Sequence, residues 1–366
     1  MYQIIAKYPT EYKITIGENC TLQDNFIEKT ARILIVSDQN VAPLYAESIT
    51  EQLQNTEVMH YTIKAGEYAK SYSTVHALEE FMQINNITKK DILIALGGGV
   101  VTDLVGFVGS IYLRGIKTIY IPTTMLAMVD AAIGGKTGIN TKYGKNQIGT
   151  ITSPYAVFID PRFLRTQTKT SWNDGWVETL KHALLENEIA FNKAYAEYKK
   201  NPNNELEKIL YDSCLTKNKI VSQDPYEKNI RACLNIGHSI GHAIESYHSY
   251  KVSHGQAVAI GIITESKIAL ELGIMNLKCF TKIYNCFVNL AKKIAPIDDE
   301  KKFVSYLLRD KKNTSSEIRM CLLSSIGEVY NKSSYLTVIS NDVILAAIKF
   351  MNTEFNQDLQ DSTSHY

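Results

Sequence analysis

The stretch DILIALGGGVVTD, residues 91–103, decides the fold class of this chain. Its first half is an apolar run typical of a buried strand, and the glycines Gly97–Gly99 join it to a segment with helical character. Glycines at such a junction let the backbone approach a diphosphate closely, and the start of the following helix offers free N–H groups. The run differs from the G-x-G-x-x-G fingerprint, so a tight turn without a ligand is an alternative interpretation.

Similar apolar runs lie on both sides of this stretch and alternate with helical patterns. Strands are predicted at 32–37, 58–63, 91–96, 118–121 and 156–159, and helices at 42–54 and 73–85. This alternation predicts an α/β fold, with a Rossmann-like, doubly wound parallel sheet that binds ligands at the carboxyl ends of its strands. Polar or glycine-rich segments follow four of the predicted strands, at 37–40, 66–70, 97–99 and 122–124. Four such strand ends favour a dinucleotide.

Glycine and proline divide the chain into two parts. Thirteen of the 20 glycines and five of the 8 prolines lie at or before Pro161. Helices tolerate neither residue well, so the second part is predicted to be all-helical, with helices at 171–199, 204–221, 231–247, 255–272 and 277–291. We therefore expect domains at residues 1–168 and 169–366, with an active-site cleft between them.

The composition excludes several classes of protein. Lys and Arg number 39 against 38 Asp and Glu, and the net charge of +1 disfavours a nucleic-acid binder. No apolar run approaches the roughly 20 residues of a membrane helix, and MYQIIAKYPTEYK does not resemble a signal peptide. The six cysteines show no CxxC spacing, so we expect reduced thiols and a cytoplasmic protein.

Four of the eight histidines fall within residues 238–254. His238 and His242 are four residues apart and share one helical face, and His254 begins the next predicted helix. Imidazoles with one carboxylate form an open zinc site, and Glu178 lies on an otherwise apolar helix face. The alternatives are core histidines, and a Glu178 that pairs with Lys181 or His182.

Residues 128–149 combine glycines and lysines directly after the predicted strand end at Thr123–Thr124. A flexible loop is one interpretation, and a segment that binds phosphate or carboxylate is the other. Other cations that are able to join such an anion pocket are Arg114, Lys217, Arg231, Lys311 and Lys312. The residues expected to form this pocket are Lys136, Asn146, Lys181, Lys217, Arg231 and Asn235. Since no acidic neighbour in sequence is numerous enough to neutralise them, we expect mutual repulsion in the empty pocket.

Taken together, these segments resemble the 3-dehydroquinate synthase family nearly end to end. The matching motifs are GGGVVTDLVGF, RGIKTIYIPTTMLAMVDAAIGGKTGINTKYGKNQIG, WVETLKHA, DPYEKNIRACLNIGHSIGHAIES, SHGQAV and RDKKN, in this order. The resemblance implies a Rossmann-like domain followed by a helical domain, and a homodimer.

The resemblance also implies the reaction. 3-Deoxy-D-arabino-heptulosonate 7-phosphate would give 3-dehydroquinate and phosphate, a step of the shikimate pathway toward chorismate and aromatic amino acids. NAD⁺ would accept a hydride from C5, phosphate would leave by β-elimination, the hydride would return, and an aldol step would close the ring. Zn²⁺, with Co²⁺ as an alternative, would polarise the C5 oxygen.

The resemblance assigns roles residue by residue. It implies metal binding by Glu178, His238 and His254, with His242 facing the substrate. The catalytic positions are Lys136, Lys181, Glu227, His242, Asp130 and Lys217, and the substrate positions add Asn146, Arg231, Asn235 and the pair Lys311–Lys312. Arg114 would reach the substrate phosphate of the neighbouring subunit. The NAD positions are Asp38, Asn40, Glu67, Lys70, Gly98, Gly99, Val100, Asp103, Thr123, Thr124, Lys145, Phe163 and Thr166.

The sequence departs from the family pattern at some positions, and other functions are possible alternatives to the family reaction. Ala183 and Gln256 stand where the family has glycine and glutamate, which leaves the surroundings of the metal open. The rivals are another sugar phosphate cyclase, a metal-dependent alcohol or glycerol dehydrogenase, and an NAD-binding regulatory protein without catalysis. The GGKTGIN and DKK segments disfavour a dehydrogenase, which needs no phosphate pocket.

Overall fold

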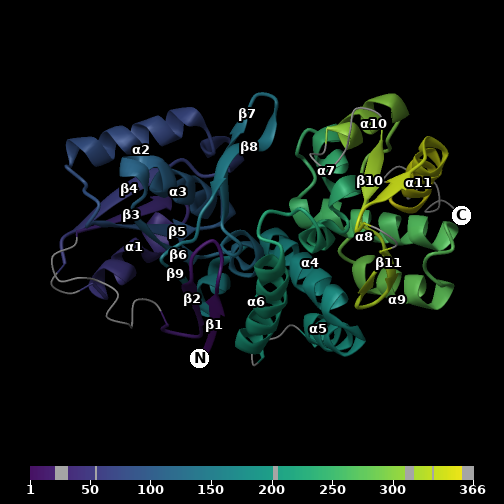
Figure 1. The fold of residues 1–366 in the computed structure, drawn as a ribbon, viewed down its shortest axis with the longest axis horizontal. Coiled ribbons are helices and arrows are strands. Elements are labelled where there is room, and N and C mark those ends of the chain that lie inside the picture. Colours follow the sequence, from purple (N-terminus) through teal and green to yellow (C-terminus); the bar gives the residue numbers. More distant parts are fainter. Residues whose placement is uncertain (21–31, 54–55, 201–204, 310–316, 332–333, 357–366) are drawn as a thin grey trace, which may run out of the picture. The chain divides into compact units, whose positions relative to one another are not determined.

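The computed structural model describes residues 1–20, 32–53, 56–200, 205–309, 317–331 and 334–356. These residues form two compact units (Figure 1). The first comprises Met1–Thr168 and Asn203–Tyr226, and the second comprises Lys169–Pro202 and Glu227–Tyr366. The chain passes from the first unit to the second between Thr168 and Lys169. It then returns to the first unit once, through the helix α6 (Leu206–Gln223).

A seven-stranded sheet organises the first unit, in the order β1-β2-β9-β6-β5-β3-β4. All neighbours in it are parallel except β1 and β2. The strands are β1 (Tyr2–Ala6), β2 (Tyr12–Ile16), β3 (Ile33–Asp38), β4 (Val58–Ile63), β5 (Ile92–Gly97), β6 (Lys117–Pro122) and β9 (Ala156–Ile159). Strand β5 is buried at every position, as expected for a central parallel strand. The five predicted strands are all present, and the doubly wound fold is confirmed.

Helices cover both faces of this sheet. They are α1 (Ala42–Glu51), α2 (Tyr72–Ile84) and α3 (Gly99–Ile111), and Figure 1 shows α2 and α3 on one side and α1 on the other. This arrangement follows from the strand order, because right-handed crossovers place helices on opposite faces when the direction of travel along the sheet reverses.

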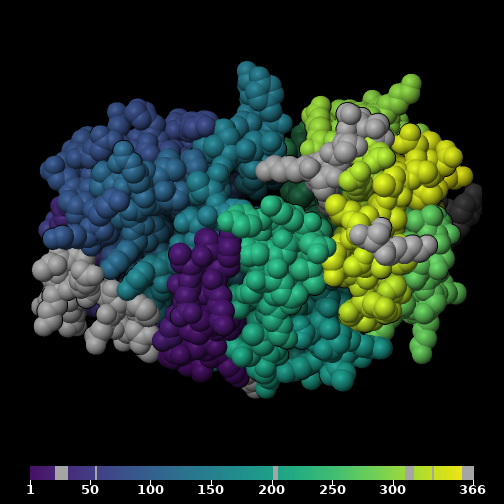
Figure 2. Space-filling view, in the orientation of Figure 1, coloured from purple at the N-terminus to yellow at the C-terminus, as the bar shows by residue number. Residues whose placement is uncertain are grey.

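Two features of the first unit differ from the sequence prediction. Strands β1 and β2 were not predicted, because their alternating patterns are short and polar residues interrupt them. The glycine- and lysine-rich segment, for which a flexible loop was one of two interpretations, contains an antiparallel hairpin of β7 (Lys136–Thr141) and β8 (Gly144–Ile151). Figure 2 shows this hairpin projecting from the surface, with Tyr143 in its turn 79% exposed.

The helix α6 had been assigned to the second domain and instead packs in the first unit. Its Cys214 thiol donates to the carbonyl of Met128, and the Asn218 amide donates to the carbonyl of Ile5 in β1. Packing on β1 and β2 decides its place, and the helical pattern of α6 alone carries no such information.

The second unit is mainly helical. Its helices are α4 (Lys169–Glu186), α5 (Glu188–Lys200), α7 (His238–Tyr247), α8 (His254–Glu271), α9 (Leu277–Phe287), α10 (Glu300–Leu308) and α11 (Asn341–Glu354). The prediction of an all-helical domain was incomplete, because β10 (Ile318–Met320) pairs with β13 (Thr337–Ile339), and β11 (Leu323–Ser325) with β12 (Glu328–Val329). None of the described helices is long and apolar enough to cross a membrane.

Candidate active site

A cluster of one carboxylate and two imidazoles lies within the second unit. Glu178 comes from α4 and is fully buried, while His238 and His254 are the first residues of α7 and α8. Glu178 Oε1 lies 3.5 Å from His238 Nε2 and 3.7 Å from His254 Nε2. One ligand atom from each residue lies within 4.8 Å of the others, which is the spacing of a metal site. The structure therefore brings together the three residues predicted to bind metal.

Close packing of α7 against α8 sets the positions of the two histidines. Gly237, just before α7, has a positive φ of 80°. A Cβ atom built on Gly261 of α8 would lie only 1.9 Å from the carbonyl oxygen of Gly237. The buried carboxylate of Glu265 in α8 accepts hydrogen bonds from the N–H groups of Gly237 at 2.6 Å and Ile240 at 3.3 Å. Glu265 therefore caps α7 at the end that carries His238.

Burial disfavours the charged forms of the groups in this cluster, and neighbouring charges also shift their pKa values. The Lys181 ammonium, one helical turn from Glu178, forms an ion pair with its carboxylate. Burial raises the pKa of Glu178, but the Lys181 ammonium is the main group that offsets burial, and the pKa stays well below its usual range. Burial, together with the nearby Lys181 charge, lowers the pKa of His238 well below its usual value. Glu178 is thus an anion and His238 a neutral imidazole, the protonation states that metal ligands require.

His254 has a different environment. Burial lowers its pKa, but the neighbouring carboxylates of Glu178 and Glu245 outweigh burial and raise the pKa to about 10. Without a metal ion, a protonated His254 is therefore the countercharge for these two carboxylates. A divalent cation would take over that role.

The donor set fits a divalent cation. Within the described part of the chain, no hydrogen bond reaches Glu178 Oε1, although this oxygen is buried. A buried carboxylate oxygen without a donor costs free energy, and a cation between it and the two Nε2 atoms would remove that cost. Two imidazoles and one carboxylate are the protein ligands of several open zinc sites.

His242 lies beside this cluster and is exposed. Its ring centroid is 5.2 Å from that of His238 and 6.2 Å from that of His254. His242 also forms a second group of ligand atoms within 4.8 Å together with Glu245 and His254. The prediction that His242 faces substrate and is no inner ligand stays a prediction.

Other predicted substrate residues of the second unit lie in the segment before α7. Arg231 and Asn235 belong to the 3₁₀ helix η5 (Ile230–Asn235), and Arg231 is buried. The Asn235 amide donates to Glu227 Oε1 at 2.5 Å, and Glu227 has a positive φ of 58°. The Lys181 ammonium donates to the carbonyl of Leu234 at 2.6 Å. Lys181 therefore links this segment to Glu178.

The first unit holds the predicted substrate residues Asp130, Lys136, Asn146 and Lys217. The Lys217 ammonium of α6 donates to Asp130 Oδ1 at 2.6 Å. This contact ties Lys217, which was predicted in the second domain, to the first unit. Lys136 is exposed at the start of β7. Asn146 accepts a hydrogen bond from the Lys70 ammonium at 2.6 Å.

Two of the predicted cations are already compensated. Lys181 is paired with Glu178 and Lys217 with Asp130, and all four residues but Asp130 are buried. The expectation of mutual repulsion among unneutralised cations is therefore wrong for these two lysines. A buried ammonium requires a partner charge, and that partner lies far away in sequence.

The glycine turn opens α3 at the carboxyl end of β5, as predicted. A Cβ atom on Gly98 would lie 3.1 Å from Thr124 Cγ2, and one on Gly99 would lie 3.2 Å from Ala131 Cβ. Val100 is in the first turn of α3. The site near Gly98 thus has little room for a side chain.

Several predicted NAD residues lie around this turn and are bonded to one another. Lys70 is buried after the 3₁₀ helix η1 (Glu67–Ala69), and its ammonium lies 2.6 Å from Asp103 Oδ2 in α3. Burial raises the pKa of Asp103, although Lys70 opposes the rise. Glu67 Oε1 accepts from the Asn140 amide at 2.8 Å.

The other strand ends are ordered by local contacts. Asp38 Oδ1 accepts from the N–H groups of Asn40 at 2.8 Å and Val41 at 3.1 Å. Thr124 Oγ1 accepts from Ala127 N–H at 3.2 Å. The predicted positions not yet placed are Thr123 at the end of β6, Lys145 in β8, and Phe163 and Thr166 in the 3₁₀ helix η4 (Pro161–Thr166).

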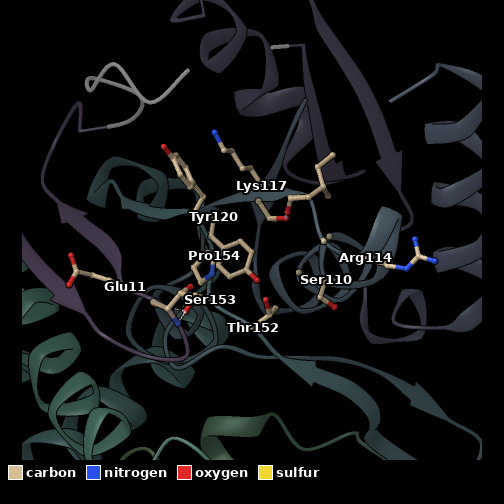
Figure 3. A pocket seen from close by; sticks show the side chains of 15 residues that line it. Glu11, Ser110, Arg114, Lys117, Tyr120, Thr152, Ser153 and Pro154 are labelled. Atoms are coloured by element: carbon tan, nitrogen blue, oxygen red, sulfur yellow. Dashed lines mark hydrogen bonds between the residues drawn. The ribbon is translucent and has the colours of Figure 1, made fainter. Parts of the chain in front are cut away.

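Arg114 lies apart from both the predicted substrate residues and the predicted NAD residues of its own unit. It lies with Leu113 in a turn of positive φ and is exposed. It lines a separate cavity of about 370 Å³, together with Ser110, Lys117, Tyr120 and Ser153. In Figure 3 its side chain extends away from Tyr120 and Ser153. Lys311 and Lys312 fall outside the described residues.

Sequence reasoning missed the carboxylates that support the cluster. Asp174 Oδ1 accepts from the Ser253 hydroxyl at 2.7 Å and from the Gly255 N–H at 2.9 Å, at the start of α8. Glu245 lies 3.4 Å from His254 Nδ1. Gln256, at a departure from the family pattern, instead donates to the carbonyl of Lys292 at 3.2 Å. A buried acid seven residues after His238, on the same helical face, was the available signal for Glu245.

Comparison with solved structures defines the class of protein. A 2-deoxy-scyllo-inosose synthase complexed with carbaglucose-6-phosphate, NAD⁺ and Co²⁺ matches with a TM-score of 0.87 and 25% identity, over 95% of this chain and 99% of that one. A 2-epi-5-epi-valiolone synthase from Streptomyces hygroscopicus with NAD⁺ and Zn²⁺ bound gives 0.83 and 25%, over 96% and 99%. An iron-containing alcohol dehydrogenase from Thermotoga maritima shares the fold, with 0.65 and 15%, over 92% and 97%. The chain thus has the dehydroquinate synthase-like fold of the sugar phosphate cyclases.

Sequence comparison defines the family. The profile of the 3-dehydroquinate synthase N-terminal domain matches residues 60–174, and that of the C-terminal domain matches residues 175–313. The 3-dehydroquinate synthase of Helicobacter pylori (strain G27) is 41% identical over 338 residues, which cover 88% of this chain and 93% of that protein. The enzyme of Streptococcus sanguinis is 38% identical over 307 residues, covering 81% and 85%. The chain belongs to the 3-dehydroquinate synthase family.

Proposed function

We propose that this protein is a carbon–oxygen lyase that converts 3-deoxy-D-arabino-heptulosonate 7-phosphate to 3-dehydroquinate and phosphate. Membership of the family supports the reaction. The observation that carries the proposal at the level of the site is the convergence of Glu178, His238 and His254 on one buried point. The product belongs to the shikimate pathway, so the protein would serve chorismate and aromatic amino acid biosynthesis.

Two bound groups complete the site. The two solved cyclases contain NAD⁺ together with Co²⁺ or Zn²⁺. When bound, NAD⁺ would supply a reversible hydride acceptor, and the divalent ion would supply a Lewis acid. Glu178, His238 and His254 would hold the ion. Zn²⁺ is the proposed metal and Co²⁺ the alternative, since the same ligands suit both.

The first unit would hold NAD⁺ at the carboxyl ends of its strands. Gly98, Gly99 and Val100 present the start of α3 to the diphosphate, where N–H groups and the helix dipole favour an anion. Asp38, the last residue of β3, is suited to a ribose hydroxyl. Lys70 holds Asp103 and Asn146 by hydrogen bonds, which would fix the nicotinamide end of the site. The other residues proposed to contact NAD⁺ are Asn40, Glu67, Thr123, Thr124, Lys145, Phe163 and Thr166.

Lysine, arginine and asparagine side chains would orient the phosphate and the carboxylate of the substrate. The proposed set comprises Lys136, Asn146, Lys181, Lys217, Arg231, Asn235 and the pair Lys311–Lys312. Charged hydrogen bonds to a dianion are strong and directional, so few protein bases are needed once the substrate is oriented. The substrate phosphate can itself accept the proton that is removed before elimination.

His242 and Glu227 would relay the proton of the substrate hydroxyl. His242 is exposed beside the metal cluster and able to reach a ligand from there. Glu227 orients Asn235 by a 2.5 Å hydrogen bond, and its carboxylate is of the chemical type that transfers protons. Asp130, paired with Lys217, keeps that ammonium in place.

Assembly and location are part of the proposal. We expect a cytoplasmic homodimer in which Arg114 reaches the substrate phosphate of the other subunit. The exposed position of Arg114, in a turn of positive φ, supports a role outside its own active site. Light scattering of the purified protein would give the number of chains.

The balance of NADH tests the proposal against its rivals. The purified protein with NAD⁺ and the heptulosonate phosphate should release phosphate and form 3-dehydroquinate, without a net change in NADH absorbance. Accumulation of NADH with glycerol or another alcohol, and no phosphate release, would favour a dehydrogenase. A different carbocycle formed from another sugar phosphate would favour another cyclase.

A further inference from the structure

The two ring nitrogens of His254 face two different carboxylates. Nε2 lies 3.7 Å from Glu178 Oε1, and Nδ1 lies 3.4 Å from Glu245 Oε2. Glu245 is on α7 and only 5% exposed, and His254 begins the neighbouring helix α8. Glu178 belongs to the proposed metal site, but that site gives no role to Glu245.

We propose that Glu245 is a positioning residue that fixes the tautomer of His254. An ionised carboxylate only accepts hydrogen bonds, so a bond to Glu245 requires a proton on Nδ1. In a neutral imidazole the lone pair then lies on Nε2, the atom that faces Glu178. Glu245 would thereby turn Nε2 toward the metal ion and raise its basicity as a ligand. This inference rests on the metal site of the proposed function.

His238 shows the same arrangement with a different acceptor. Its Nδ1 lies 3.2 Å from the carbonyl oxygen of Ile236, and its Nε2 lies 3.5 Å from Glu178 Oε1. A carbonyl oxygen also accepts only, so this contact again places the proton on Nδ1. Two separate acceptors therefore leave both Nε2 lone pairs facing the same carboxylate oxygen. That agreement is expected of a metal site and is not needed for packing alone.

The alternative is that Glu245 is itself a ligand. Glu245, His242 and His254 also bring ligand atoms within 4.8 Å of one another. In that case His254 would bind through Nδ1 and carry its proton on Nε2. The two assignments thus place the metal and the proton on opposite nitrogens of the His254 ring.

A titration with Co²⁺ tests the inference without relying on catalysis. Metal-stripped wild type, Glu245→Gln and the control Glu354→Gln are titrated, and the visible absorption of bound Co²⁺ is followed. Glu354 is a carboxylate of the same unit, on α11, where the Tyr284 hydroxyl donates to it. We expect one ion per chain in wild type and in Glu354→Gln, and affinity about 10–100-fold lower in Glu245→Gln, which is typical of the loss of an outer partner.

Each other outcome overturns a specific statement. Equal affinity in Glu245→Gln and wild type would refute the role of Glu245 while leaving the metal site intact. Two ions in wild type and one in Glu245→Gln would make Glu245 a ligand. Absence of Co²⁺ binding by wild type would refute the proposed metal site itself.

Nuclear magnetic resonance of the wild-type protein covers the case in which Glu245→Gln fails to fold. Protein labelled with ¹⁵N-histidine and loaded with Zn²⁺ should show His254 with a proton on Nδ1 and the metal on Nε2. The reverse assignment would overturn the inference.

Discussion

At the scale of single residues, the cluster of Glu178, His238 and His254 shows what a sequence conveys about chemistry. Glu178, His238 and His254 were identifiable because their types and motifs match a known family, and the structure brings their donor atoms within 4.8 Å. The partners of these residues were not identifiable. Lys181 was only one of two candidate partners for Glu178, and the contacts of Glu245 and Glu265 depend on how α7 and α8 pack.

Glu178→Gln should abolish tight zinc binding. The substitution removes the anionic ligand, so we expect Zn²⁺ affinity to fall by more than about 100-fold, the upper end for loss of an outer partner. The measurement is competition with a chromophoric chelator, with circular dichroism to follow the folded fraction.

Lys181→Met is the matched control, because it breaks the same ion pair but keeps the carboxylate. It should bind Zn²⁺ at least as tightly as wild type, since a nearby positive charge is removed. Tight zinc binding by Glu178→Gln would show that this glutamate is not a ligand.

Lys136→Met should impair the reaction while leaving the fold and NAD⁺ binding intact. Lys136 is exposed at the start of β7, so its loss leaves no buried charge. A hydrogen bond to a charged group contributes about 1.5–3 kcal/mol, which corresponds to a fall in kcat/KM of about 10–150-fold. Steady-state kinetics of phosphate release measure the effect.

Lys142→Met provides the comparison for that variant. Lys142 is exposed in the same hairpin, with its ammonium 4.9 Å from the centre of the Tyr143 ring. It should retain wild-type kinetics. If both variants retain wild-type kinetics, Lys136 is a surface charge and the dehydrogenase hypothesis gains support.

At the scale of helices and strands, periodicity predicted most of the elements. The buried strands of the parallel sheet were found because they are short, continuous apolar runs, as β5 shows. The hairpin β7–β8 was not predicted, because its glycines and lysines mask the strand pattern. One of these glycines, Gly149, has a structural reason, because a Cβ atom there would lie 1.9 Å from the Thr137 carbonyl oxygen. The hairpin therefore needs glycine for close strand pairing.

Gly98→Val should prevent NAD⁺ binding at the start of α3. A Cβ atom at this position already approaches Thr124 Cγ2 to 3.1 Å, and the valine methyl groups would fill the space proposed for the diphosphate. We expect affinity for NAD⁺ to fall at least 10-fold, on the order of the loss of one good hydrogen bond to an anion. Gly98→Ala should give an intermediate value by calorimetry, and unchanged affinity in Gly98→Val would move the cofactor elsewhere.

Gly261→Ala should separate α7 from α8. Its methyl group would lie 1.9 Å from the Gly237 carbonyl oxygen, and main chain cannot yield as a side chain can. We expect the free energy of unfolding to fall by about 1–3 kcal/mol, together with weaker zinc binding, because His238 and His254 would move apart. Urea unfolding and metal titration measure the two effects.

Glu271→Ala, at the far end of α8, is the control for helix substitutions. Its carboxylate forms an i,i+4 ion pair with Lys267 that is partly exposed, so stability should change little. If Gly261→Ala is as stable as this control and binds zinc normally, close packing of the two helices does not position the histidines.

At the scale of the whole molecule, each unit of the fold combines two segments that are not consecutive in the chain. The change from strands to helices placed the boundary at residue 168, and the units divide there. The return of α6 to the first unit was not predictable, because helical periodicity shows which face is buried and not what covers it. Lys217 was consequently assigned to the wrong domain, although its residue type and its role as a candidate were predicted.

The measurement that tests the central claim most directly is phosphate release from 3-deoxy-D-arabino-heptulosonate 7-phosphate before and after removal of the metal. The proposed site predicts that the purified protein with NAD⁺ releases phosphate, that stripping with a chelator stops the release, and that Zn²⁺ or Co²⁺ restores it in wild type but not in Glu178→Gln. Undiminished phosphate release by protein shown to be metal-free would contradict the account.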